Sequence, residues 1–356
     1  MGRLMEFEAL YARHAGDLED FWGRRENELR FQREFAIFGH SVRMASNQAG
    51  VLAAADFSRP LYSTAPLVER APLTIRLVVR PAPLAVGPVP PVPGNLFSHI
   101  QYTGEGDWLA LQLGAWGHCQ VDLAAGRALA VLTPELAEQP EIVSRCLLNT
   151  LFNNLLTARG LSMLHATSLV RSGRVLLLIA PHHTGKSTSA LSLALAGYPL
   201  MSDSQVYITP QAAGLSLTGF PVGRVKLRRD MVPSFPELRA LLTEEDVRGE
   251  TKFVLDLRQL NPALVHDAAI VPSGVELCLL TRHADPATIL RPATREAVME
   301  AAMLNSLHYD RAEAWRPNVA AIERLVDMAR WHHLLVGTDA GQLVGAVDEL
   351  WADTAP

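Results

Sequence analysis

A buried apolar run that leads directly into a loop ending in Gly-Lys-Ser is the feature that most constrains the fold. Residues 175–179 read as a short strand, residues 180–187 read Ala-Pro-His-His-Thr-Gly-Lys-Ser, and residues 188–196 read as a helix rich in Ala and Leu. A loop between a buried strand and a helix can turn its backbone N–H groups inward, where they and the positive helix end hold a polyphosphate. This order of elements predicts a nucleotide-binding P-loop.

Each residue type in the loop has an expected role. Lys186 would reach the β and γ phosphates, Ser187 would offer its hydroxyl to Mg2+, and Gly185 would allow a close backbone approach. The pattern also occurs by chance, and Ala180 stands where glycine is commoner, so the flanking strand and helix support the prediction more than the motif does. The predicted nucleotide-binding residues are Ala180, Pro181, His182, His183, Thr184, Gly185, Lys186, Ser187 and Thr188.

A carboxylate follows the next apolar segment. Residues 198–201 read as a strand that ends in Ser202-Asp203-Ser204. A carboxylate at the end of a neighbouring strand is where a P-loop protein places a group near Mg2+ or the attacking nucleophile. Ser187 and Asp203 are therefore the predicted metal ligands. The alternative to a P-loop at residues 180–187 is an ordinary strand-to-helix turn with a solvated lysine, which the surrounding strand and helix pattern disfavours.

Composition limits the classes of partner. The net charge of −5 provides no broad basic field for nucleic acid or anionic lipid, so both are disfavoured as partners. The three cysteines lack metal-ligand spacing and are expected to be reduced and buried. We see no signal peptide and no run of about 20 apolar residues, so a cytoplasmic protein is expected.

At 356 residues the chain is long enough for two domains. Residues 1–137 are expected to form a smaller β-rich α+β domain, with a helical segment at 4–31, a proline-rich connector at 81–94, and an antiparallel sheet at 98–132. A helix over 138–159 opens the second domain, residues 138–356. Its alternating strands and helices predict an α/β P-loop domain with a mixed sheet.

Residues 160–280 resemble the HPr kinase/phosphorylase family. Its members have a His opening a strand, a turn, a strand into the P-loop, a helix ending in Gly plus a large residue, and a strand that meets an acidic motif. His165 also lies 21 positions before Lys186, like the active-site histidine of that family. The corresponding segments are Leu164-His165-Ala166, Arg171-Ser172-Gly173, residues 180–187, Gly197-Tyr198 and Ser202-Asp203-Ser204.

The resemblance implies ATP and Mg2+ as cofactors and transfer of the γ-phosphate to a hydroxyl, serine by expectation, of a peptide or protein. It implies a fold like the family's C-terminal domain, and homo-oligomers, which many members form. It also implies His165 as a donor near the nucleotide, although a hydrogen-bonded core histidine is the alternative. The predicted catalytic residues are His165, Lys186, Asp203 and Arg224.

Basic residues follow the acidic motif. Alternation places Arg224, Lys226 and Arg228 on one face of a strand, where they could neutralise a transferred phosphate or form a solvated edge. Resemblance to the relatives favours Arg224 and Lys226, with Lys252 a weaker candidate. The family's Mg2+-binding Glu has no clear counterpart, and Glu250 is only a guess.

The chain departs from the family at one position. Ser204 stands where the relatives have a second aspartate, the proton acceptor, and a hydroxyl cannot take a proton at neutral pH as a carboxylate can. Either Asp203 takes over, or proton removal matters little, or catalysis is lost. The leading hypothesis is a serine kinase, the second a catalytically silent ATP-binding scaffold that recruits a partner. A P-loop ATPase or GTPase switch is third, since no base-reading motif is found.

Overall fold

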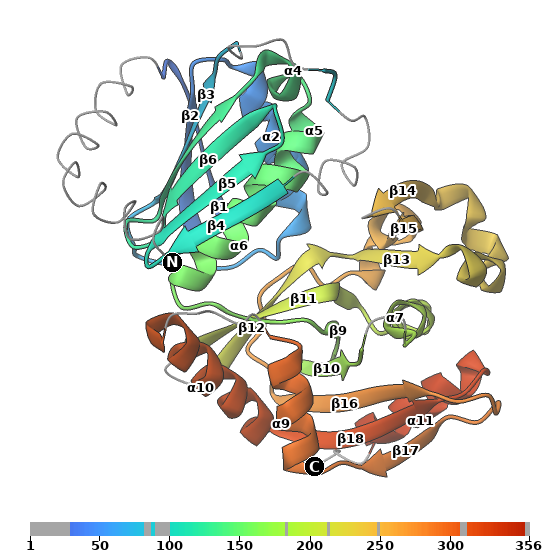
Figure 1. Cartoon of the computed structure of the whole chain (residues 1–356). Coiled ribbons are helices and arrows are strands. Elements are labelled where there is room, and N and C mark those ends of the chain that lie inside the picture. The colour runs from blue at the N-terminus through green and yellow to red at the C-terminus, as the bar shows by residue number, and fades with distance from the viewer. Residues whose placement is uncertain are drawn as a thin grey trace.

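The computed structural model describes residues 29–81, 87–89, 100–181, 184–211, 214–247, 250–306 and 312–352. The helical segment predicted before residue 29, most of the proline-rich stretch, and His182 and His183 lie outside these residues. Two large sheets carry the described chain, one formed by its first part and one by its second part (Figure 1). The protein is therefore mixed α/β, as the sequence predicts at that level.

The first sheet has seven strands in the order β1-β2-β3-β7-β6-β5-β4. Strands β4 to β7 form the antiparallel run that the sequence predicts, but β3 pairs in parallel with both β2 and β7, so the sheet is mixed. Its strands are β1 (Phe31–Ile37), β2 (His40–Ser46), β3 (Leu73–Val79), β4 (Ile100–Glu105), β5 (Trp108–Leu113), β6 (Gly117–Asp122) and β7 (Arg127–Leu132).

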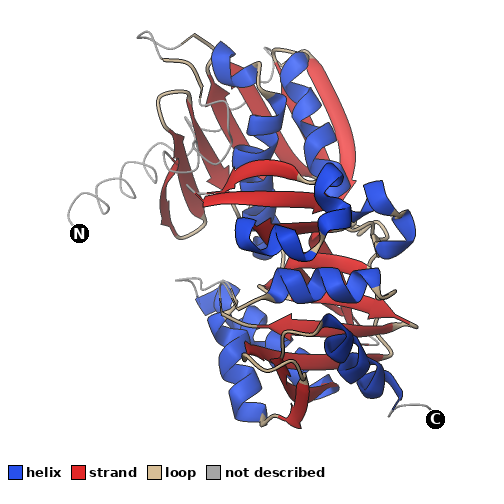
Figure 2. Cartoon of the chain, turned by 90° about the vertical axis from the view of Figure 1, so that its right-hand side faces the viewer, coloured by secondary structure: helices blue, strands red, loops and turns tan. Residues whose placement is uncertain are grey.

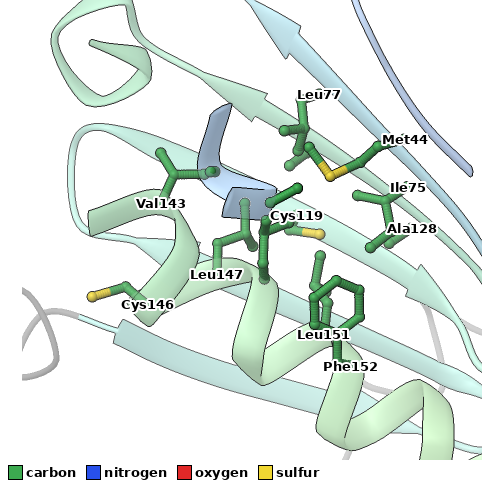
Figure 3. Close-up of a cluster of buried hydrophobic side chains, with 14 of the residues drawn as sticks. Met44, Ile75, Leu77, Cys119, Ala128, Val143, Cys146, Leu147, Leu151 and Phe152 are labelled. Atoms are coloured by element: carbon green, nitrogen blue, oxygen red, sulfur yellow. The ribbon is translucent and has the colours of Figure 1, made fainter. Parts of the chain in front are cut away.

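A helical segment packs across the first sheet. It comprises α5 (Pro140–Ile142), a π-helical stretch (Val143–Leu148) and α6 (Asn149–Ala158). Val143, Leu147 and Leu151, spaced at i and i+4, meet strand residues such as Ile75 in one buried cluster (Figure 3). This segment, which the sequence analysis placed at the start of the second domain, therefore shares its hydrophobic core with the first sheet.

The second sheet has eight strands, seven of them in the order β12-β11-β9-β10-β16-β18-β17 and β8 paired with β11. Strands β10, β16 and β18 are parallel neighbours, while β9 is antiparallel to both β10 and β11. The strands are β8 (Ser162–Leu164), β9 (Thr167–Arg171), β10 (Arg174–Ile179), β11 (Leu200–Gln211), β12 (Gly214–Val222), β16 (Gly274–Arg282), β17 (Ile289–Pro292) and β18 (Ala329–Val336).

Strand β10 is buried on both of its faces. Leu176 and Leu178 pack with α7 and α11, whereas Val175, Leu177 and Ile179 pack with α9 and α10. Figure 2 shows helices on both sides of this sheet. A strand covered on both faces reads as a continuous apolar run, which is why the sequence predicts it correctly. The helices are α7 (Lys186–Leu195), α9 (Arg295–Leu304), α10 (Ala312–Met328) and α11 (Ala340–Ala352).

A smaller three-stranded sheet, in the order β13-β15-β14, lies beside the second sheet. The strands of the small sheet and the remaining short helices are β13 (Arg224–Arg228), β14 (Thr243–Val247), β15 (Glu250–Asp256), α2 (Ala54–Ser58), α4 (Pro134–Ala137), α8 (Leu257–Leu260), η1 (Gly50–Ala53), η2 (Arg59–Leu61), η4 (Arg229–Ser234), η5 (Pro236–Leu241) and η6 (Pro262–Leu264).

Among the described residues, no helix is both long and apolar enough to cross a membrane.

Two predicted strands differ from those observed. The resemblance implies that His165 opens a strand, but His165 and Ala166 separate β8 from β9, and each of these strands pairs with a different part of β11. The strand predicted to end before Ser202 instead continues through Asp203 to Gln211. Pairing with three separate strands extends β11, and such long-range partners are invisible to local periodicity.

A buried ionic cluster lies near the amino ends of the parallel strands. Glu276 of β16 is 1% exposed and accepts hydrogen bonds from Arg174 and from Arg330, the latter at 2.7–3.1 Å, while His332 Nε2 lies 2.9 Å from its Oε2. Burial alone would raise the pKa of Glu276, but the hydrogen bonds from His332 and Arg330 and the charges of Arg330 and Arg174 outweigh it and lower that pKa. The cluster therefore ties β10, β16 and β18 together.

We expect Glu276→Gln to lower the free energy of unfolding by about 3–5 kcal/mol, because it leaves the largely buried cation of Arg174 without its counter-charge. Chemical denaturation would measure this, with Glu296→Gln on the exposed side of α9 as the control. Because the pKa of Glu276 in the folded protein lies below its usual value of 4.5, its contribution to stability is present above pH 4.5 and is lost as the pH falls through the folded pKa. A Gln variant as stable as the control would contradict this account.

Candidate functional site

The loop 180–185 leaves the carboxyl end of β10 and enters α7 at Gly185. Gly185 has φ +97°, a left-handed conformation that favours glycine. A Cβ atom at this position would lie only 2.6 Å from Nε of Arg282, the last residue of β16. Any larger residue would therefore strain the backbone and displace Arg282 from its place against the loop.

The first turn of α7 is suited to an anion. Among the described residues no side chain caps this helix, so the leading N–H groups stay directed past its amino end. The hydroxyl of Thr184 donates to the carbonyl of Pro181, which folds the loop on itself. The structure thus has a strand before the loop and a helix after it, and phosphate binding by the loop stays a prediction.

Lys186 is buried at the start of α7. Its side chain is folded back, and Nζ donates a hydrogen bond to the carbonyl of Ala180. Burial lowers the pKa of Lys186, and the nearby charge of Asp203 partly offsets this effect. The ammonium is therefore poorly solvated, and a phosphate ligand would provide the counter-charge that it lacks.

A bulge in β11 positions Asp203. Ser202 pairs with Val222 and Gln205 pairs with Phe220, so β11 has one more residue than β12 in this interval. The extra residue breaks the regular alternation of side chains. The hydroxyl of Ser202 accepts hydrogen bonds from the backbone N–H groups of Ser204 (3.1 Å) and Gln205 (3.2 Å). These bonds satisfy the backbone donors at the bulge.

Asp203 is 8% exposed and contacts residues of β9, β13 and α7. Its Oδ1 accepts a hydrogen bond from the Thr167 hydroxyl at 2.9 Å, its Oδ2 lies 3.5 Å from the N–H of Lys226, and the Ser187 hydroxyl also donates to it. Burial raises the pKa of Asp203 to about 6, although these hydrogen bonds and the charge of Lys186 lower it. The structure thus brings Lys186, Ser187 and Asp203 together.

Two other predicted residues, His165 and Arg224, contact other parts of the chain. His165 lies two residues before Thr167, and its backbone N–H donates to the carbonyl of Asn305 at 2.6 Å. Arg224 pairs with Glu245 at 3.4 Å, on the strand that also carries Lys226. The expected roles of His165 and Arg224 toward a nucleotide stay predictions.

Sequence reasoning missed Thr167 and Arg282. Thr167 holds the carboxylate, and nothing local distinguishes it from other threonines in strands. Arg282 could have been found, because it ends an apolar run parallel to β10, and ligands bind beyond the carboxyl ends of parallel strands. Glu250, guessed as a Mg2+ ligand, forms an ion pair with Lys252 at 3.3 Å.

The residues present fit a magnesium nucleotide. The hydroxyl of Ser187 and the carboxylate of Asp203 are the oxygen ligands that Mg2+ prefers, and the metal usually keeps several waters and phosphate oxygens as its other ligands. In the described part of the chain there is no group of three or more His, Cys, Asp or Glu side chains placed to hold a metal ion.

We expect Asp203→Asn to stabilise the ligand-free protein at pH 8 by on the order of 1–3 kcal/mol. Because the pKa of Asp203 is raised from 3.8 to about 6, the ionised carboxylate destabilises the fold above pH 6, and this penalty disappears as the pH falls toward 4. Thermal unfolding at pH 8 and pH 4 would measure it, with the exposed Asp285→Asn as the control. Equal stabilities at pH 8 would contradict the assigned burial cost.

Comparisons with known proteins give likenesses among solved structures alone. A scan against protein-family models found no match, and a search of curated proteins found none. Among solved structures, the HPr(Ser) kinase/phosphatase from Coxiella burnetii is similar, with a TM-score of 0.29 and 12% sequence identity, over 54% of this chain and 98% of that chain.

Proposed function

We propose that this chain binds Mg-ATP at the loop 180–185 and the start of α7, and that it transfers the γ-phosphate to a hydroxyl. The observation that carries the proposal is that the buried carboxylate of Asp203 interacts with both the Ser187 hydroxyl and the charge of Lys186 at the start of α7. A lysine, a hydroxyl and a carboxylate in this order around a helix terminus are the groups that phosphoryl transfer needs.

Lys186 and the first N–H groups of α7 would hold the phosphates. The ammonium now bonded to the Ala180 carbonyl would turn toward the β and γ phosphates, exchanging a neutral acceptor for an anionic one. Arg282, which lies against Gly185, adds a second cation at the same end of the sheet. Two cations on either side of the loop would stabilise the charge of the transferred group.

When bound, Mg-ATP supplies the phosphoryl group and a metal that neutralises its charge. Ser187 and Asp203 would hold that metal, directly or through a bound water. The Thr167 hydroxyl and the Lys226 N–H keep the carboxylate of Asp203 in place. A carboxylate fixed on two sides is pre-organised and does not have to be ordered during the reaction.

Asp203 also has the properties of a proton acceptor. Its pKa of about 6 lies close to neutral pH, where a general base works best. Ser204, which stands where the resembling family has a second aspartate, is half-buried and cannot share this task. One carboxylate would then serve both the metal and the acceptor hydroxyl. The proposed acceptor is serine in a peptide or protein, the class that the sequence resemblance implies.

The lack of a second aspartate at position 204 also supports the second candidate function, an ATP-binding scaffold without catalysis. Ser204 leaves Asp203 as the one carboxylate of the motif, and its engagement by Ser187 and Thr167 could be purely structural. Both candidates predict binding of Mg-ATP, but ADP formation is expected only of the kinase.

We expect Lys186→Ala to reduce ADP formation by about 10²-fold or more, because it removes a charged donor from the developing phosphate charge. A coupled assay of ADP release and a titration with a fluorescent ATP analogue would measure turnover and binding. Arg228→Ala, which removes an exposed cation paired with Asp230, is the matched control and should match the wild type. Equal ADP formation in wild type and Lys186→Ala would overturn the kinase, and Mg-ATP binding without any ADP formation would favour the scaffold.

We expect Ser204→Asp to raise turnover by about 10²-fold if proton removal limits the reaction, which is the scale of general-base catalysis. The added carboxylate would divide the metal and proton roles between two residues. The ADP assay measures this, and Ser204→Asn tests for an effect of size without charge. If neither variant changes turnover, proton removal is not limiting.

A further inference from the structure

The small sheet β13-β15-β14 has one apolar and one charged face. Val225, Leu227 and Leu255 are buried in the core that contains α7. The opposite face carries Lys226 and its alternating neighbours. Directly paired residues share a face, so the register places β15 and β14 side chains there also. Those residues are Arg224, Lys226, Arg228, Thr243, Glu245, Lys252, Val254 and Asp256.

An arginine from the first part of the chain joins this charged face. Arg145, in the π-helical stretch that packs on the first sheet, donates a hydrogen bond to Glu245 of β14. Its side chain is 16% exposed and that of Glu245 is 10% exposed, so the pair is largely buried. The charged face therefore lies between the two large parts of the protein. We define the basic cluster as Arg145, Arg224, Lys226 and Lys252.

The carboxylates beside the basic cluster are already engaged. Glu245 is shared by Arg145 and Arg224, and Glu250 pairs with Lys252. Within the described chain, the ammonium of Lys226 has neither a hydrogen bond nor an ion pair. Burial lowers the pKa of Lys226, the charge of Glu245 raises it, and the charges of Arg145, Arg224 and Lys252 lower it further. A partly buried cation is thus held among like charges without a partner.

The backbone connects Lys226 to the proposed reaction centre. Its N–H lies 3.5 Å from Oδ2 of Asp203, so the residue that orients the carboxylate also carries the unpaired ammonium. A group bound at Lys226 would therefore lie on the strand whose backbone contacts Asp203.

We propose that the basic cluster binds an oxyanion, a carboxylate or a phosphate, carried by the acceptor beside its reactive hydroxyl. The proposal deepens the proposed function and rests on it for the identity of the ligand as acceptor. A carboxylate or phosphate would satisfy Lys226 with a charge-assisted hydrogen bond and reduce the repulsion among the four cations. Such an anion would also fix the hydroxyl next to Asp203, which selects for acidic acceptors.

Anion binding can be measured without knowing the acceptor. Thermal unfolding would be followed with inorganic phosphate and, separately, with succinate, each in the presence of saturating Mg-ADP to occupy the nucleotide loop. We expect at least one anion to raise the unfolding temperature of the wild type. Lys226→Gln should bind that anion at least tenfold more weakly. A response to phosphate alone assigns a phosphorylated acceptor, and one to succinate assigns a carboxylate.

Control variants separate a local effect from loss of folding. Arg228 lies on the same strand face, but its side chain is exposed and paired with Asp230. The variant Arg228→Gln should therefore respond to anions like the wild type. Lys226→Gln without anion should unfold at or above the wild-type temperature, because a buried unpaired charge has been removed. The proposal is overturned if no anion stabilises the wild type, or if Lys226→Gln keeps the full response.

The anion response and ADP formation fail independently. A protein that forms no ADP but binds anions through Lys226 would lose the kinase assignment and keep the site. A protein that forms ADP in a Lys186-dependent way without any anion response would keep the kinase and lose the basic cluster as a binding site.

Discussion

The burial of β10 on both faces determines where the loop can form. Leu176 and Leu178 pack on one layer of helices, and Leu177 and Ile179 pack on the other. Both faces of the strand are therefore covered, and a solvent-accessible loop can begin only beyond its carboxyl end. The loop 180–185 therefore emerges at the sheet edge, directly before α7. Every group of the proposed site is placed relative to that point, because β9, β11 and β16 take their positions from the pairing with β10 or with each other.

The two ends of the parallel strands balance charge differently. Near the amino ends, Glu276 is buried with Arg174, Arg330 and His332 around it, so its charge is matched by hydrogen bonds. At the carboxyl ends, burial lowers the pKa of Lys186 and raises that of Asp203, and these effects exceed the opposite effects of the attraction between the two charges. Matched charges hold strands together, whereas unmatched charges are maintained at a cost in stability and are typical of a functional site.

The part of the site that the sequence predicts is the part that local pattern determines. Residues 175–187 could be assigned as strand and loop because apolar residues on both faces give a continuous run and because glycine, lysine and serine follow at fixed spacing. The alternation of Arg224, Lys226 and Arg228 is likewise local, and the structure places them on one strand face. These features need no knowledge of distant segments.

The rest depends on contacts between segments far apart in the chain. The bulge that turns Asp203 toward Ser187 arises from the register of β11 against β12, and no residue type in the sequence marks it. Arg145 meets Glu245, 100 positions later in the chain, because the helical segment that carries Arg145 packs on the first sheet. The sequence pattern places that segment in the second domain. Periodicity identifies the buried face of a helix but cannot identify the surface against which it packs.

The opposite pKa shifts of Lys186 and Asp203 suggest how the site can respond to its ligand. Burial lowers the pKa of the ammonium and raises that of the carboxylate to about 6, so each group is driven toward its neutral form when no ligand is bound. A polyphosphate would favour the charged lysine and a divalent cation would favour the charged aspartate. Binding of the two together would therefore relieve both penalties. Since neither ligand alone would relieve both, we expect the proposed site to favour the magnesium complex over the free nucleotide.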